Sequence, residues 1–580
     1  MRWQAKGLVK GFRTVFPAIL LAVLSSLTPA RWHLEAQAGM HPVVLTDPSA
    51  WQPASDRSDW IGETGTLSSP KGLDRSQEAL LFLPNAQVAD GVLRVKFRMT
   101  SWPHYIQAKL IFRSLDSHRF YMVSAFSMAT DMGFSQGEGL MGLALWRGNA
   151  SGYRELLSYV PYLPWKPGRW YEMRVDLAGP LITASLYSDL EKRDKPLIRV
   201  QDTHYLRGSL GVAANGPAEF KDLSIAPAVL SDATTTGWKR IEEKPYWPAW
   251  PKDRAERGAQ PRMIRTPSGS LLLAASEMYF RPGPTSQVFL FGSSDEGRTW
   301  KPVSSVPVGY TGQLFAASDD TIWLLDSYVP GDEPGKFRRW TQEDVHSGKM
   351  APFVPHIRKS RNDGKSWTEA EPLKILDFPK LSFNRGGLSM YVPPRKLQDG
   401  SLLLPVMMAA QKPDPLVIQP LLLRSSDQGK TWHAGLIDPN HADASETDLI
   451  ELTPHRLLAL MRTNFFTGFN GEARSRDGGK SWTPIKLGGL PGSSSGPRLL
   501  MTKSGALLCL HRFLGTMFSL SRDEGQTWRT FQVDTPIEVM GDLLELPGGR
   551  VLVVYSAGGW AGIPRLQSLR ATPHGIEPAR

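Results

Sequence analysis

The order of apolar and polar residues indicates a chain built from short strands. Between about residues 45 and 230, apolar and polar side chains alternate in several segments, among them 92–97, 108–112, 170–175 and 181–186. Alternation with a period of two indicates strands that are buried on one face. Helical periodicity is hard to find, and Gly (53 residues) and Pro (46 residues) are plentiful, which favours an all-β chain with many turns.

From residue 258 onward, the chain repeats two kinds of turn. One lies between two apolar strands and occurs six times, with its central position at Gly269, Asp320, Gly400, His455, Gly505 and Gly549. The other is eight residues long and occurs five times, as SSDEGRTW (293–300), SRNDGKSW (360–367), SSDQGKTW (425–432), SRDGGKSW (475–482) and SRDEGQTW (521–528). The two turns define a unit of four strands, and four strands repeated radially describe a β-propeller blade. Six units therefore predict six blades.

The eight-residue turn predicts architecture and not chemistry. Its short acid can accept hydrogen bonds from backbone N–H groups, and its glycine can adopt a positive φ. Its hydroxyl can close the turn, and its tryptophan can bury its ring between strands. A catalytic residue has no need to occur five times, and each turn offers too few carboxylates for a convincing calcium site.

These turns resemble the Asp-box, or BNR, repeats of the sialidase (neuraminidase) superfamily, over about residues 258–560. Residues 45–230 resemble the concanavalin A-like jelly-roll domains of the laminin G and glucanase type, through the segments FRSLDSHRFYMV, GRWYEMRVDLAG and GSLGVAANGPAEFKDLSIAP. The expected fold is all-β, with an N-terminal jelly-roll sandwich followed by a six-bladed β-propeller over 258–580. Residues 231–257, rich in Pro and Trp, are expected to form a linker and to supply a strand that closes the ring.

The first 38 residues have the layout of a secretory signal peptide. Basic residues precede an apolar run over 15–24, which is short against the ~20 residues that span a bilayer. We therefore expect a secreted or periplasmic protein without stable membrane insertion after signal removal; an uncleaved anchor is the alternative. The net charge of +11 is scattered along the chain without a long basic run, so no nucleic-acid partner is expected. The single cysteine, Cys509, cannot form an intramolecular disulfide, and we expect a monomer without cofactor or metal.

Alignment of the six units reveals candidate site residues at matching levels of the ring. Seven residues after the central turn position, two adjacent units carry Arg462 and Arg512. Planar guanidinium groups that converge on one point suit a carboxylate; a chance pair of surface arginines is the alternative. Nine residues before the turn position, near the start of an innermost strand, stands Glu446.

The resemblance to sialidases implies roles for these three residues. Glu446 would orient and deprotonate a tyrosine nucleophile, while Arg462 and Arg512 would hold the carboxylate of a sialic acid. The chain departs from the family elsewhere. The family's first arginine, in an R-I-P triplet, falls in Ala259-Gln260-Pro261, next to Arg262, and its tyrosine falls on Met540. In the family, an aspartate in the loop after the second strand of the first unit acts as the general acid. The matching loop here, SEMYFRPGPTSQ, contains no aspartate.

Other residues can substitute for the missing groups. Tyr391 occupies the same position as Glu446 one unit earlier, so the two side chains could meet. Asp542 lies two residues beyond Met540 and therefore on the same strand face. Arg385 could replace the lost cation. For each, strand packing or a solvated rim is the alternative interpretation.

The sequence thus predicts an exported, sialidase-like exo-glycosidase that acts on an acidic or sialic-acid-type glycan. Two carboxylates such as Glu446 and Asp542 could also support glycoside cleavage of another kind. The alternative is a non-catalytic glycan- or protein-binding propeller, which would use the same arginines to hold an anionic ligand.

Overall fold

A computed structural model of the chain describes residues 41–43, 51–54, 59–73, 77–100, 106–128, 139–188, 195–227, 229–230, 259–277, 287–308, 312–330, 337–338, 354–377, 386–411, 416–440, 444–463, 469–492, 496–535, 538–557 and 563–579. The regular structure in these ranges is strand, apart from one 3-10 turn at Pro547–Gly549, and this confirms the all-β prediction. The predicted signal peptide (1–38) and linker (231–257) lie outside the described residues. Within the described ranges, no helix is long and apolar enough to cross a membrane.

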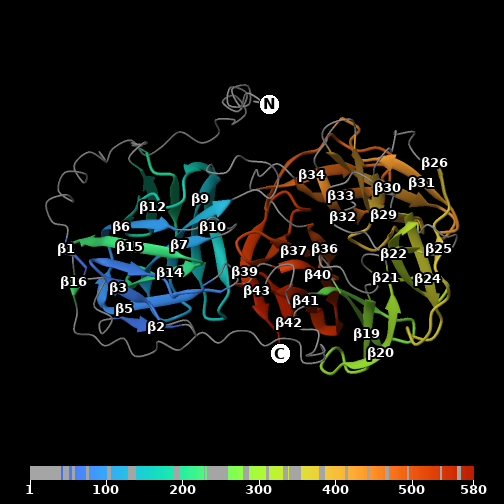
Figure 1. Cartoon of the computed structure of the whole chain (residues 1–580), viewed down its shortest axis with the longest axis horizontal. Helices are drawn as coiled ribbons and strands as arrows, with labels where there is room; N and C mark the ends of the chain where they lie inside the picture. Colours follow the sequence, from blue (N-terminus) through green and yellow to red (C-terminus); the bar gives the residue numbers. More distant parts are fainter. Residues whose placement is uncertain are drawn as a thin grey trace.

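The N-terminal part consists of two antiparallel sheets (Figure 1). One sheet has the order β13-β12-β11-β6-β15-β4-β3 with β1 beside β15, and its strands are β1 (His41–Pro42), β3 (Ile61–Glu63), β4 (Thr66–Ser68), β6 (Gly91–Met99), β11 (Tyr171–Ala178), β12 (Leu181–Tyr187), β13 (Ile198–Gln201) and β15 (Ala218–Ala226). The other has the order β16-β5-β14-β7-β8-β9-β10 with β2 beside β5, and its strands are β2 (Gln52–Pro53), β5 (Ala79–Val88), β7 (Gln107–Ser114), β8 (Tyr121–Met128), β9 (Gly139–Gly148), β10 (Arg154–Trp165), β14 (Gly208–Asn215) and β16 (Val229–Leu230).

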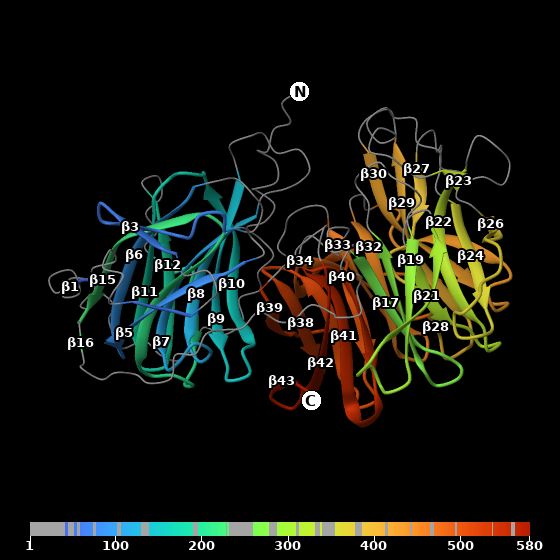
Figure 2. The same ribbon diagram turned by 60° about the horizontal axis from the view of Figure 1, so that its bottom comes forward.

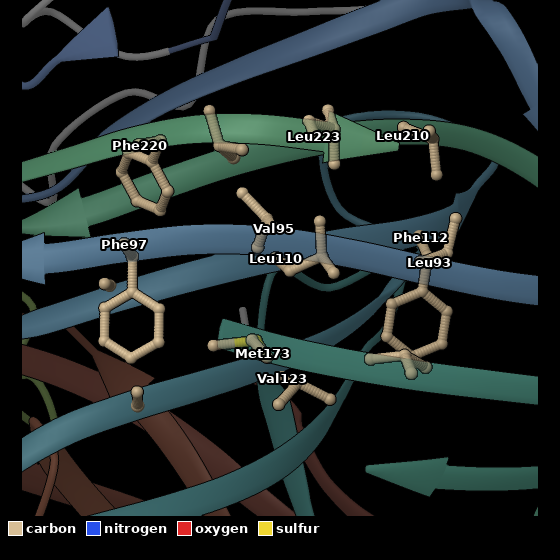
Figure 3. Close-up of a cluster of buried hydrophobic side chains, with 14 of the residues drawn as sticks. Leu93, Val95, Phe97, Leu110, Phe112, Val123, Met173, Leu210, Phe220 and Leu223 are labelled. Atoms are coloured by element: carbon tan, nitrogen blue, oxygen red, sulfur yellow. The ribbon is translucent and has the colours of Figure 1, made fainter. Parts of the chain in front are cut away.

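A shared apolar core makes these two sheets a sandwich. Leu93, Val95 and Phe97 alternate along β6 and are fully buried, as the period-two pattern predicts. They pack in one cluster with Leu110 and Phe112 of β7 in the opposite sheet (Figure 3). The two-layer arrangement follows from this core, and the jelly-roll connection between the strands remains a prediction.

The C-terminal part folds as a β-propeller of successive, mainly antiparallel units, numbered here in chain order (Figures 1 and 2). Unit 1 contains β17 (Ala259–Arg265), β18 (Leu271–Glu277), β19 (Gln287–Ser293) and β20 (Lys301–Pro307). Unit 2 contains β21 (Gln313–Ala316), β22 (Ile322–Pro330), β23 (Phe337–Arg338), β24 (Val354–Ser360) and β25 (Glu371–Pro372). Unit 3 contains β26 (Ile375–Asp377), β27 (Gly386–Ser389), β28 (Arg395–Lys396), β29 (Leu402–Gln411), β30 (Leu416–Ser425) and β31 (Trp432–Leu436).

The later units are more regular, with four strands each. Unit 4 contains β32 (Ala444–Thr453), β33 (Arg456–Thr463), β34 (Phe469–Ser475) and β35 (Lys486–Pro491). Unit 5 contains β36 (Arg498–Met501), β37 (Leu507–Arg512), β38 (Thr516–Ser521) and β39 (Arg529–Asp534). Unit 6 contains β40 (Glu538–Glu545), β41 (Arg550–Ala557), β42 (Ile563–Thr572) and β43 (Gly575–Pro578).

Among the described residues, five units are blades with sheets of their own, one fewer than the six predicted. The strands of unit 5 belong instead to a 12-stranded sheet that continues into the sandwich. The reason is that β39 pairs antiparallel with β10, with Glu155 opposite Phe531 and Leu156 opposite Thr530. The outer strand of unit 5 is therefore shared between the two parts of the chain.

Leucine-rich cores join neighbouring units around the ring. Leu272 of unit 1 packs with Leu324 of unit 2, for example, and similar clusters join units 2 and 3, 3 and 4, 4 and 5, and 5 and 6. Met263 and Leu273 of unit 1 pack with Val554 of unit 6, which closes the ring. The sheet of unit 6 takes its four described strands from 538–578, and the predicted closing strand falls in residues 231–257, outside the described residues.

Both repeated turns adopt the predicted geometry. The six central positions of the first turn all have φ between 57° and 90°, including the non-glycine residues Asp320 and His455. In the box at 425–432, Gly429 N donates to Ser425 Oγ (2.7 Å), and Trp432 Nε1 donates to Gly429 O (3.1 Å). The backbone N and Oγ1 of Thr431 donate to the carboxylate of Asp427 at 2.9 and 2.5 Å. The other boxes repeat this network, with Asn362 in place of the acid in the second.

Each Asp box packs against the preceding unit of the ring. A Cβ at Gly429 would lie 2.3 Å from the Trp323 ring of unit 2, and the same close approach occurs in the other boxes between Gly297 and Leu552, Gly364 and Leu272, Gly479 and Leu403, and Gly525 and Leu458. Only glycine fits this approach with a positive φ. The boxes therefore pack at the contacts between neighbouring units, called seams below, and this confirms their structural role.

Candidate functional site

A small pocket lies where the innermost strands of the ring begin. Its lining comes from units 1, 3, 4, 5 and 6 and from the segments that lead into them: Arg262, Tyr391, Val392, Glu446, Gly496, Pro497, Arg498 and Gly541. The space open to the centre of a water molecule is about 10 Å³, which is room for about one water. The described residues thus form a narrow pocket and not a sugar-sized cleft.

Glu446 is held in this pocket by two donors. It stands near the start of β32 and is 4% exposed. Arg462 Nη1 donates to its Oε1 at 3.1 Å, and the backbone N of Gly496 donates to its Oε2 at 2.6 Å. A Cβ at Gly496 would lie 2.7 Å from the Cβ of Glu446, so a larger residue there would displace the carboxylate. Each oxygen of Glu446 still has a second acceptor position.

Tyr391 lines the same pocket, as its aligned position next to Glu446 suggests. Its side chain is half-buried, and its backbone carbonyl accepts a hydrogen bond from Arg262 Nη2 at 2.5 Å. The structure thus brings Tyr391, Glu446 and Arg462 together from adjacent units 3 and 4. Their chemical roles remain predictions.

The side chain of Arg262 contacts residues of four units. The sequence indicated Arg262 only as a neighbour of the position where the family has its first arginine. Its side chain is fully buried, with 1% of the residue exposed. Nε donates to Gln313 Oε1 at 2.6 Å, and Nη1 donates to the carbonyls of Pro261 and Gly541 at 2.7 and 3.1 Å. Together with the bond to Tyr391, these contacts use its donors for units 1, 2, 3 and 6.

A buried ionic network adjoins the pocket. Arg498 Nε donates to Asp542 at 2.6 Å, and its Nη1 donates to Asp448 at 3.1 Å, while Arg395 Nε donates to Asp448 at 2.9 Å. Burial alone would raise the pKa of Asp448, but the charges of Arg395 and Arg498 outweigh it and hold that pKa below its ordinary value. Burial likewise opposes the charge of Arg498, yet Asp542 and Asp448 keep its pKa above the ordinary value.

Asp542 therefore differs from the sequence prediction. It is 1% exposed, and both its oxygens are engaged by Arg498 Nε, by the backbone N of Leu543 (2.9 Å) and by that of Met263 (2.8 Å). These bonds fix units 1, 5 and 6 to one another. Its contacts are those of a structural carboxylate in an ion network, not of an acid that faces a substrate.

A sequence signal for this network exists at the position two residues beyond that of Tyr391 and Glu446. Counted seven residues before the turn position, the six units carry Arg262, Gln313, Pro393, Asp448, Arg498 and Asp542. Residues two apart lie on the same face of a strand. Charged residues of opposite sign at this position in three consecutive units therefore predict a buried ion network. The network is missed when only the position of Tyr391 and Glu446 is compared between units.

The remaining candidates are not joined to the pocket by the described contacts. Arg512 is the last residue of β37 and is half-buried, but it is not among the lining residues. Its convergence with Arg462 stays a prediction. Arg385 lies outside the described residues. Among the described residues, no group of three His, Cys, Asp or Glu side chains could hold a metal ion.

A ring of four-stranded units, with Asp boxes at its seams and a glutamate–arginine pair near the start of an inner strand, defines an Asp-box β-propeller. The family model of the BNR repeat-like domain matches residues 313–533. The chain is 26% identical over 337 residues to a sialidase of Micromonospora viridifaciens, a match that covers 51% of this chain and 49% of that protein. It is 24% identical over 245 residues to a sialidase of Bacteroides fragilis (strain YCH46), covering 38% and 42%.

The chain thus spans about half the length of the curated relatives it matches, or less. Among solved structures, the leech intramolecular trans-sialidase in complex with 2,7-anhydro-Neu5Ac is similar with a TM-score of 0.43 and 11% identity, over 83% of this chain and 94% of that one. The sequence matches support the sialidase and BNR-repeat superfamily for the propeller, at an identity that leaves activity to experiment.

Proposed function

We propose that the protein is a sialidase-like glycoside hydrolase that acts on an acidic or sialic-acid-type glycan. The observation that carries this proposal is the pocket that Tyr391 and Glu446 both line, with Glu446 fixed by hydrogen bonds from Arg462 and from the backbone of Gly496. The similarity to two sialidases supports the same reaction class.

In the proposed reaction, Tyr391 is the nucleophile and Glu446 is its base. Glu446 takes the phenol proton, the tyrosyl oxygen forms a bond to the anomeric carbon, and the bond to the leaving oxygen breaks with its electron pair going to that oxygen. The leaving oxygen takes a proton from water. In the second step a water oxygen forms a bond to the anomeric carbon and gives up a proton to solution, the bond to the tyrosyl oxygen breaks with its electron pair going to that oxygen, and Glu446 returns the phenol proton to it. A neutral phenol suits an anionic sugar because no negative charge approaches the substrate carboxylate. Arg462, which also donates to Glu446, and Arg512 hold the substrate carboxylate in this proposal.

Turnover of aryl glycosides tests this proposal. Methylumbelliferyl sialoside and glucuronide are incubated with the full chain and with Glu446→Gln and Tyr391→Phe. Because each removes a group that acts in the transition state, we expect kcat to fall by about 100-fold or more. The matched control is Glu451→Gln on the same strand, whose carboxylate accepts bonds from Gln398 N and His455 N near the outer turn. Equal activity of Glu446→Gln and Glu451→Gln contradicts the proposal.

A second candidate function is glycan binding without catalysis. Two features of the sequence favour it: Met540 stands where the family has its tyrosine nucleophile, and the loop over 276–287 contains no aspartate to act as the general acid. Saturable binding of free sialic acid, weakened by Arg462→Ala, together with no turnover of any glycoside, would establish binding in place of hydrolysis.

We also infer the finer architecture. Unit 5 serves as a sixth blade whose outer strand is shared, and six apolar cores, one at each seam, support this. Residues 45–230 form a concanavalin A-like accessory domain, supported by the two-sheet core and by the segments that resemble that class. Residues 1–38 direct export to the periplasm or the medium, supported by their basic and apolar layout, and the mature chain is a monomer.

A further inference from the structure

The strand end that carries Arg512 is anchored in the N-terminal sandwich. Phe513 and Leu514 directly follow Arg512, form the tip of the hairpin between β37 and β38, and are fully buried. Phe513 lies edge-on to Phe126 of β8, with 5.6 Å between ring centroids. The carbonyl of Leu514 accepts a hydrogen bond from Gln532 Nε2 at 2.6 Å and a long one from Gln107 Nε2 of β7 at 3.5 Å.

One aromatic ring of the sandwich reaches the strand ends of both candidate arginines. Tyr159 of β10 lies 5.1 Å from Phe513 and 5.2 Å from Phe469, measured between ring centroids. Phe469 begins β34, and its carbonyl accepts a hydrogen bond from Thr463 Oγ1 at 3.0 Å. Thr463 is the residue after Arg462. The ring of Tyr159 therefore contacts Phe513, the residue after Arg512, and Phe469, whose carbonyl is bonded to the residue after Arg462.

The sandwich is held against unit 5 firmly enough to fix this ring. Strand β10 pairs with β39, so the backbone of the two parts is continuous in one sheet. Arg154 donates to both oxygens of Glu78 at 2.7 and 2.6 Å and to Gln532 Oε1 at 3.2 Å, and Glu78 and Arg154 are almost fully buried. Glu78 thus fixes Arg154, whose bond to Gln532 crosses the junction together with a charge-assisted bond from Arg529 Nε to Glu155 at 2.8 Å, and these bonds resist rotation of one part against the other.

The same junction covers part of the outer face of the sandwich. Phe82, Phe120 and Trp146 on that face form one buried cluster with Phe513, Leu514 and Met517 of the propeller. This part of the face is occupied by the hairpin of unit 5, so it is not open to a sugar. Its role in the structure is contact with the propeller.

We propose that the sandwich is a positioning domain whose Tyr159 sets the spacing between the strand ends of Arg462 and Arg512. In this proposal, Tyr159 acts through its ring contacts with Phe469 and Phe513. The effect on ligand affinity rests on the proposed function of the two arginines, whereas the effect on the two strand ends does not.

Hydrogen–deuterium exchange of the full chain tests the positioning role without a ligand. Tyr159→Ala removes both aromatic contacts, so we expect about tenfold faster exchange in peptides from 456–475 and 507–521. The matched control is Trp60→Ala, which removes a comparable aromatic contact with Phe220 in the sandwich and away from the propeller. Tyr159→Phe keeps the ring and should exchange like the parent. Unchanged exchange of either strand end in Tyr159→Ala, or an equal change in Trp60→Ala, overturns the proposal.

A ligand measurement separates this proposal from the proposed function. With free N-acetylneuraminic acid as the probe, we expect Tyr159→Ala to weaken binding about fivefold to tenfold and to raise KM for the aryl sialoside with little change in kcat. If the parent neither binds nor turns over sialosides, the proposed function fails and the exchange result still decides the positioning role. If the parent binds and Tyr159→Ala binds equally well, Tyr159 does not position the arginines.

Discussion

Replacement of Arg498 by methionine tests whether the ion network near the pocket depends on each charge. Arg498 bonds to Asp542 and Asp448, and the three side chains are 9%, 2% and 0% exposed. Removal of the cation leaves two buried carboxylates, one of which retains Arg395. Removal of one partner from a buried ion pair costs about 3–5 kcal/mol of unfolding free energy because the remaining charge is uncompensated. We expect a loss in this range for Arg498→Met at pH 7.

The loss should also depend on pH. In the wild type, the depressed pKa of Asp448 contributes stability that is present above about 3.9, the ordinary value of an aspartate, and is lost as the pH falls through the lower folded value. In Arg498→Met, Asp448 loses one of its two cations while its burial remains, so its pKa rises. The carboxylate then takes up a proton as the pH falls, and the difference from wild type should shrink between pH 7 and pH 4.

Denaturant unfolding followed by tryptophan fluorescence measures this loss. The control is Arg456→Met, which breaks an exposed ion pair with Glu524 between neighbouring units and should cost no more than about 1 kcal/mol. Addition of Asp542→Asn to Arg498→Met should recover part of the stability, because Asp448 keeps its ion pair with Arg395 and no unpaired buried carboxylate then remains. A loss below about 1 kcal/mol for Arg498→Met, or an equal loss at pH 4 and pH 7, would refute the reasoning.

Two further predictions concern the Asp boxes. Gly429→Ala, whose Cβ would lie 2.3 Å from the Trp323 ring, should lower the melting temperature well beyond Gly400→Ala, which has the same φ of 83° but nothing within 4 Å; equal melting temperatures would contradict the seam role. Hydrogen bonds from Thr431 lower the pKa of Asp427 to about 2, so the stability from this box should be present above the ordinary pKa and be lost as the pH falls through about 2. When the melting temperature is measured as a function of pH, Asp427→Asn should lack the fall that titration of Asp427 causes in the parent. A pH profile identical to that of the parent would contradict this prediction.

The repeated turns could be predicted from the sequence because their requirements are local. Gly400 and His455 occupy a position where the chain needs a positive φ, and the hydroxyl, acid and glycine of each box bond within eight residues. The turns also predicted six blades, of which five have sheets of their own among the described residues. The pairing of β39 with β10 could not be predicted, because it joins residues almost 400 positions apart through backbone groups that every residue carries.

The candidate site could be predicted only in part, because its geometry depends on which units face one another. Glu446 and Arg462 lie on paired strands of one unit, so their contact follows from the alignment of that unit. Arg262 contacts Gln313, Tyr391 and Gly541, three residues from three other units. Those contacts form only when the ring is closed. The order of the units can be read from the sequence, but how far each side chain reaches towards the axis of the ring cannot.

The difference between seam and axis explains why one turn repeats and the site does not. At five of the six seams, a box meets the same kind of neighbour, a leucine or tryptophan of the preceding unit, so the same residues serve five times. Near the axis, the inner strands converge and each side chain meets several different units, so complementary residues are needed in place of identical ones. Arg498 between Asp448 and Asp542 is such a set, drawn from three consecutive units. When repeated units are aligned, a position that carries a cation in one unit and a carboxylate in the next therefore indicates side chains that meet near the axis. A position that carries the same residue in every unit indicates a contact between neighbouring units.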